Sequence, residues 1–137
     1  MEENAKELFR FVIPGKPKYV NMVRLAIASI AGDIMFDIDA IEDIKISLTE
    51  ACKLIACHGH EGFCNTYEIS CNLYDGKMEI AVTDSCNQYG IHKDIRPCIN
   101  CPEDGNLSLV VIDSLMDAVE DTKNEEGRRR IVMVKNI

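Results

Sequence analysis

Two cysteines in the second half of the chain have a spacing that could bind metal or undergo redox chemistry. Cys98 and Cys101 form a Cys-x-x-Cys pair between two prolines, which is half of a zinc site or a thiol–disulfide pair. His58, His60 and Cys64 could complete tetrahedral zinc, but their spacing matches no standard zinc pattern. We therefore expect no metal site and favour a loop that carries two thiols.

Three helices must help to position any such chemistry. Apolar residues at helical spacing predict helices from Pro17 to Ile34, from Ile41 to Ile55 and from Leu107 to Asp117. Asp39, followed three residues later by Glu42, is typical of a capping box and predicts the start of the second helix. We expect the second and third helices to pack side by side on a sheet.

Strands account for the remaining regular segments, with a turn at Asp75-Gly76. The order strand, helix, helix, strand, strand, helix, strand is typical of an α/β (α+β) two-layer sandwich, with helices on one face of a mostly antiparallel sheet.

Residues 84–106 form a long irregular stretch, as functional lids do. We expect one domain over residues 1–137, and we expect Arg128, Arg129 and Arg130 to be edge-strand charges. The strands are predicted over residues 7–13, 67–73, 78–82 and 129–134.

The charge balance narrows the class of partner. The chain has 137 residues, with 15 Lys and Arg against 23 Asp and Glu, for a net charge of −8. This balance disfavours nucleic acid or an anionic membrane and favours a basic protein surface. The acidic start carries no secretion signal and no long apolar run follows, so we expect a cytoplasmic protein whose seven cysteines are mostly reduced.

Three segments together resemble a known family. Glu50 lies on the second predicted helix, Asp84 ends a predicted strand, and Gly105 precedes the helix over residues 107–117. In this order they resemble the bacterial anti-sigma-factor serine kinases of the GHKL (histidine-kinase-like) ATPase superfamily. The resemblance covers nearly the whole chain and implies the histidine-kinase-like ATPase fold, with residues 84–106 as a lid-like loop.

The resemblance also implies roles for two carboxylates. The family has a Glu as general base and, four residues later, an Asn that ligates the Mg²⁺ bound to the ATP phosphates. Glu50 matches the Glu, but Leu54 stands at the Asn position, and a leucine side chain offers Mg²⁺ no oxygen. Asp84 matches the Asp that hydrogen-bonds adenine, while Cys86 and Gln88 replace the two glycines of that motif. Both carboxylates also have ordinary interpretations, as a solvated helix residue and as a turn residue.

The third nucleotide motif of the family is a Gly-x-Gly-Leu turn, whose backbone N–H groups hold phosphate at a helix start. The matching residues are Asn106, Leu107, Ser108 and Leu109, preceded by Gly105. Asn and Ser still permit a helix to start here. Because all three motifs depart from the family pattern together, we expect the use of ATP and Mg²⁺ to be impaired.

These observations support three hypotheses. The first is an anti-sigma-factor-like regulator that acts by partner switching between a sigma factor and a STAS-domain anti-anti-sigma factor; a homodimer is left open. Arg24, on the first helix, is either a solvated residue or, as the resemblance implies, part of the partner surface. The second is an active ATP-dependent serine/threonine protein kinase acting on the STAS antagonist. The third is a thiol or zinc sensor built on the same scaffold.

Overall fold

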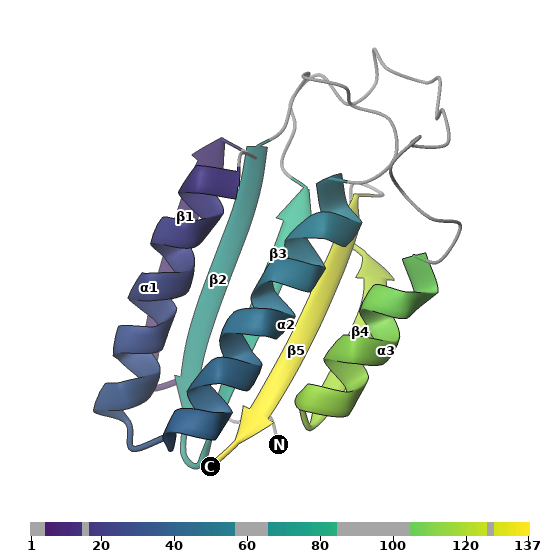
Figure 1. The fold of residues 1–137 in the computed structure, drawn as a ribbon. Helices are drawn as coiled ribbons and strands as arrows, with labels where there is room; N and C mark the ends of the chain where they lie inside the picture. Colours follow the sequence, from purple (N-terminus) through teal and green to yellow (C-terminus); the bar gives the residue numbers. More distant parts are fainter. Residues whose placement is uncertain (1–4, 15–16, 57–65, 85–104, 126–127) are drawn as a thin grey trace, which may run out of the picture.

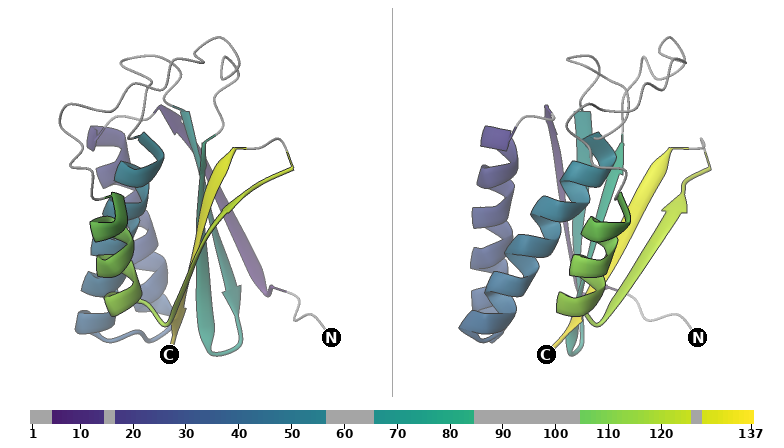
Figure 2. Two further views of the ribbon diagram at one scale, coloured as in Figure 1. Left: turned by 90° about the vertical axis from the view of Figure 1, so that its right-hand side faces the viewer. Right: turned by 45° about the vertical axis from the view of Figure 1, so that its right-hand side comes forward.

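Helices and strands form two layers, with the helices covering one face of the sheet (Figures 1 and 2). This confirms the predicted α+β sandwich. The computed structural model describes residues 5–14, 17–56, 66–84, 105–125 and 128–137. Within these ranges the elements are β1 (Glu7–Pro14), α1 (Pro17–Asp33), α2 (Ile38–Ala56), β2 (Thr66–Tyr74), β3 (Lys77–Asp84), α3 (Gly105–Leu115), β4 (Ala118–Lys123) and β5 (Arg129–Asn136).

The sheet has the strand order β1-β2-β3-β5-β4, and each neighbouring pair is antiparallel. The hydrophobic pattern predicted no strand at β4. The prediction of edge-strand charges was therefore wrong, because β5 lies between β3 and β4 and is not an edge strand. Arg129 instead pairs with Asp121 of β4, with Nη2 and Oδ2 2.7 Å apart.

The core lies between the sheet and the helices. β2 alternates strictly between buried and half-buried residues, as a strand does when only one of its faces covers a core. α2 is the central helix, with α1 on one side and α3 on the other (Figure 1). The prediction that the second and third helices pack side by side is confirmed. The largest fully buried side chains include Ile27, Ile44, Leu48, Ile69, Met78, Ile80, Ile112, Ile131 and Met133.

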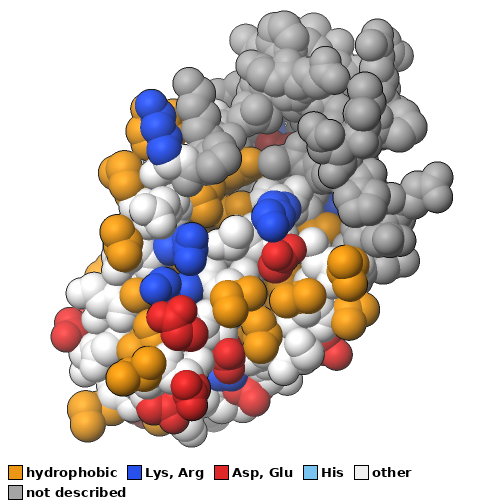
Figure 3. Space-filling model, in the orientation of Figure 1, with side chains coloured by type: hydrophobic (Ala, Val, Ile, Leu, Met, Phe, Trp, Pro, Cys, Tyr) orange, Lys and Arg blue, Asp and Glu red, His pale blue; other side chains and the backbone are white. Residues whose placement is uncertain are grey.

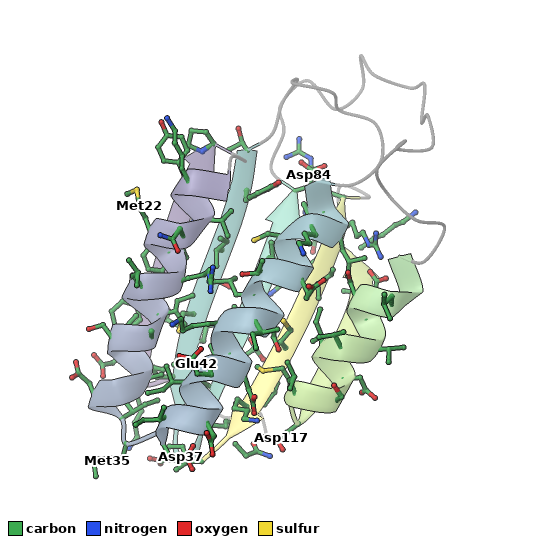
Figure 4. All side chains as sticks on the ribbon, viewed as in Figure 1. Met22, Met35, Asp37, Glu42, Asp84 and Asp117 are labelled. Atoms are coloured by element: carbon green, nitrogen blue, oxygen red, sulfur yellow. The ribbon has the colours of Figure 1, made fainter. Side chains whose placement is uncertain are left out.

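The start of α2 differs from the predicted capping box. Asp37 is the N-cap, since its Oδ1 accepts a hydrogen bond from the backbone N of Ala40 at 2.7 Å. Asp39 lies inside the first turn, and Glu42 pairs with Lys45 at 3.2 Å. The cap lies two residues earlier than predicted. It directly follows the turn after α1, in which Met35 has a φ of 75°. Figure 4 shows Met35 and Asp37 at this connection.

Replacing Asp37 by alanine is expected to lower the free energy of unfolding by about 1 kcal/mol, because the N–H of Ala40 loses its acceptor. Asp39→Ala is the matched control, since it removes the same carboxylate from an exposed position in the first turn and should change stability by less than about 0.5 kcal/mol. Urea unfolding of the two variants measures both effects. Equal losses would contradict the assignment of the cap.

Candidate functional site

The Glu50 carboxylate lies between α2 and α3, and both of its oxygens are engaged. Ser108 Oγ, from the first turns of α3, donates a hydrogen bond to Glu50 Oε2 at 2.7 Å. Lys53 Nζ, from the next turn of α2, donates to Glu50 Oε1 at 3.3 Å. The Glu50 side chain is only 20% exposed to solvent. The Glu50 carboxylate is therefore fixed by hydrogen bonds at the contact between two helices, and Glu50 is not a freely solvated surface residue.

Leu54 follows Glu50 by one turn of α2 and belongs to the core, with 3% of its surface exposed. Its backbone carbonyl accepts a hydrogen bond from Arg129 Nη1 at 3.3 Å. The same guanidinium holds Asp121 through two further N–H groups, at 3.0 Å and 2.7 Å. Residue 54 thus offers a cation no side-chain oxygen, and its carbonyl already has a donor. At the position where the resemblance places the Mg²⁺ ligand, the chain therefore holds a buried hydrocarbon side chain, which does not fit that ion.

Asp84 is the last residue of β3 and is 7% exposed, which sets it apart from an ordinary surface turn residue. It lies opposite Tyr67 in the β2–β3 register. Burial, with smaller contributions from Cys52 and Asp84, raises the pKa of the Tyr67 hydroxyl. Burial also raises the pKa of the Cys52 thiol to about 12. Figure 4 shows Asp84 at the end of β3, close to the C-terminal end of α2.

The remaining predicted residues fall in different places. α3 begins at Gly105, and its Leu107 side chain is 58% exposed. Among the side chains of this stretch that the structure describes, Ser108 is the one with a hydrogen bond to Glu50. Arg24 lies on α1, on the other side of α2 (Figure 1). Its Nε is buried and makes no hydrogen bond within the described part of the chain. Cys86, Gln88, Cys98, Cys101 and the 57–64 segment lie outside the described residues.

Two residues of this site were missed from the sequence. Lys53 follows Glu50 by three residues, a spacing that brings helix side chains together, so its ion pair could have been found. Arg129 donates to the Leu54 carbonyl from 75 residues away in the sequence, and no local sequence pattern predicts that contact. Among the described residues no group of three or more His, Cys, Asp and Glu side chains could hold a metal ion. No helix in the described ranges is long and apolar enough to cross a bilayer.

The fold and the arrangement of α2, α3 and the end of β3 define a class of protein. Residues 13–135 match the histidine kinase-like ATPase domain, and the chain belongs to this family. Over 136 residues it is 34% identical to the serine-protein kinase RsbW of Halalkalibacterium halodurans, a match that covers 93% of this chain and 82% of the relative. It is 30% identical over 127 residues to RsbW of Bacillus licheniformis, which covers 85% of this chain and 79% of that protein. RsbW of Bacillus cereus strain AH820 is 32% identical over 140 residues, or 96% and 86% of the two chains. The resemblance to the anti-sigma-factor serine kinases is thereby confirmed.

Proposed function

We propose that this protein is an anti-sigma-factor-like regulator that controls transcription in the cytoplasm by partner switching, with a site that no longer supports phosphoryl transfer. The proposal is carried by two neighbouring residues of α2. Leu54, at the position that the resemblance gives to the metal ligand, is buried, and both carboxylate oxygens of Glu50 accept hydrogen bonds. The partners would be a sigma factor and a STAS-domain anti-anti-sigma factor.

The chemistry of the site supports the loss of kinase activity. Phosphoryl transfer depends on positioning and on neutralising the charge of the phosphates. The side chain at residue 54 supplies no oxygen for a cation, and Ser108 puts a side chain where the family has glycine. Asp84 persists as a buried carboxylate at the end of β3, so part of the inherited nucleotide site would be retained as shape rather than as working chemistry.

The helical face supports the binding function. Figure 3 shows hydrophobic, basic and acidic side chains interspersed over it. Met22 and Leu25 on α1 are 60% and 59% exposed, and Ile46 on α2 is 42% exposed. Exposed apolar side chains together with an arginine, here Arg24 on α1, are the composition from which protein interfaces are built. With a net charge of −8, a partner with a basic surface is electrostatically favoured.

We expect the protein to bind its sigma factor without nucleotide and to transfer no phosphate from labelled ATP and Mg²⁺ to the STAS-domain antagonist. Arg24→Ala should weaken sigma-factor binding by about tenfold or more, the effect of removing an interface arginine. Arg10→Ala is the matched control, because Arg10 lies on β1 and pairs with Glu68 of the sheet. Calorimetric titration and gel autoradiography measure the two activities.

The kinase alternative has a specific observation in its favour, since the relatives are named serine-protein kinases. Robust phosphate transfer that Glu50→Ala abolishes would establish that alternative. Equal sigma-factor affinity for Arg24→Ala and Arg10→Ala would remove Arg24 from the proposed interface. Absence of any sigma-factor binding would contradict the regulatory function itself.

A further inference from the structure

The contact between Ser108 and Glu50 has a chemical meaning beyond helix packing. It joins residues 58 positions apart on two different helices, with Ser108 Oγ 2.7 Å from Glu50 Oε2. That distance is typical of a short, charge-assisted O–H···O⁻ hydrogen bond. The family turn that this segment resembles has glycine at residue 108, so the hydroxyl is a feature of this chain.

A carboxylate that serves as general base must accept the proton of the hydroxyl that attacks. The two groups need to be within about 2.6–3.2 Å of one another. In a serine-protein kinase the attacking group is a serine hydroxyl, the same functional group that Ser108 carries. Ser108 therefore makes the contact with Glu50 that an incoming serine would have to make, and Lys53 holds the other carboxylate oxygen.

Other contacts hold α3 against the rest of the fold independently of the Ser108 hydroxyl. Ile112 of α3 and Leu48 of α2 are both fully buried in the core between the layers. At the far end of α3, Lys135 donates a hydrogen bond to the Leu115 carbonyl. The same ammonium also pairs with Asp43 of α2, at 3.2 Å. Because α3 is fixed at this end and along its buried face, removing the Ser108 hydroxyl should leave the helix docked.

We propose that Ser108 is an internal pseudosubstrate. Its hydroxyl hydrogen-bonds to the Glu50 carboxylate and thereby blocks the hydroxyl of an acceptor protein from making the same contact. The proposal rests on the proposed function and deepens it, because it gives the inactivity a second cause that is separate from Leu54. It also predicts that loss of one hydroxyl group frees the carboxylate, whatever the partner is.

The test measures how accessible the Glu50 carboxylate is, in the full chain without nucleotide or partner. Carbodiimide with glycine ethyl ester labels free carboxylates, and mass spectrometry reports the rate at Glu50. Ser108→Ala and Ser108→Gly should each raise that rate by about tenfold, as expected for loss of a hydrogen bond to a charged group. Ser108→Thr, which keeps the hydroxyl, should label like the wild type.

Ser114→Ala is the matched control. Ser114 lies on the same helix, and its Oγ donates to the Val111 carbonyl at 2.7 Å without involving α2, so its loss should leave labelling of Glu50 unchanged. Equal labelling of Glu50 in the wild type and in both Ser108→Ala and Ser108→Gly would overturn the proposal. Phosphoserine at Ser108 after incubation with ATP and Mg²⁺ would also overturn it, because Ser108 would then be a substrate. The labelling readout depends neither on sigma-factor binding nor on phosphate transfer, so equal labelling would overturn this proposal alone. Phosphoserine at Ser108 would in addition contradict the proposed loss of kinase activity.

Discussion

Raising the pH above about 9 is expected to destabilise the folded protein steeply. Cys52 and Cys71 are buried thiols, 4% and 0% exposed, and burial raises the pKa of each from 9.0 to about 12. Between these values the unfolded chain loses both protons while the folded chain keeps them. The free energy of unfolding then falls by about 1.4 kcal/mol per thiol for each pH unit. Below pH 9 both states are protonated, so these thiols add no pH dependence.

Two such thiols together lower the free energy of unfolding by about 3 kcal/mol per pH unit, against a typical total of about 5–15 kcal/mol. The raised pKa of Tyr67 acts in the same direction, because burial also disfavours its phenolate. We therefore expect cooperative alkaline unfolding within this window. Urea unfolding at about pH 8, 9.5 and 10.5, under reducing conditions, measures the slope.

Removing one thiol at a time is the control. Cys52→Ala and Cys71→Ala should each reduce the slope by about 1.4 kcal/mol per pH unit, whatever they do to stability at neutral pH. The slope, and not the stability at one pH, is therefore the informative quantity. An unchanged slope in the double variant would show that groups other than these thiols cause any alkaline destabilisation.

The parts of the fold that face the core could be predicted from the sequence. The alternation in β2 and the helical stripe in α2 are direct consequences of one-sided burial. β4 gave no such signal, since it reads Ala-Val-Glu-Asp-Thr-Lys and none of its residues is fully buried. Its pairing with β5 and the Arg129–Asp121 ion pair hold it in place. Both are tertiary contacts, which local hydrophobic pattern does not encode.

The C-terminal end of α3 also could not be predicted from the local sequence pattern. The apolar spacing predicted a helix as far as Asp117, but α3 ends at Leu115. The backbone N of Asp117 donates instead to the Val134 carbonyl at 2.8 Å, and its carboxylate accepts from the backbone N of Asn136 at 2.6 Å. Contacts with β5 therefore turn the chain toward β4 two residues earlier than the pattern indicates. Figure 4 shows Asp117 at this turn.

The site could be predicted only in part. The resemblance indicated Glu50, Leu54, Asp84 and Ser108 as positions of interest, and the structure brings Glu50 and Ser108 into contact. That Ser108 bonds to Glu50 could not be predicted, because the two residues lie on separate helices and no spacing rule joins them. The burial of Leu54 could have been predicted, since Leu54 is next to Ile55 in the apolar stripe of α2.

Replacing Leu54 by asparagine is expected to destabilise the protein by about 3–5 kcal/mol instead of restoring a working metal ligand. The leucine side chain is 97% buried, since 3% remains exposed. The substitution removes apolar contacts and places a polar amide in the hydrophobic core cluster to which Leu54 belongs. Urea unfolding gives the loss, and the melting temperature with and without ATP and Mg²⁺ shows whether a ligand has been gained. We expect the two nucleotide conditions to give the same melting temperature.

Two variants separate burial from chemistry in this result. Leu25→Asn makes the same change at a residue of α1 that is 59% exposed, and it should alter stability by less than about 0.5 kcal/mol. Leu54→Met keeps the apolar volume and should lose less than about 1.5 kcal/mol. If Leu54→Asn were as stable as the wild type and gained stability from ATP and Mg²⁺, asparagine at residue 54 would supply the metal ligand without damage to the core. The inactivity would then rest on Ser108 and the lost glycines alone, because the buried leucine would no longer be a structural obstacle to the metal.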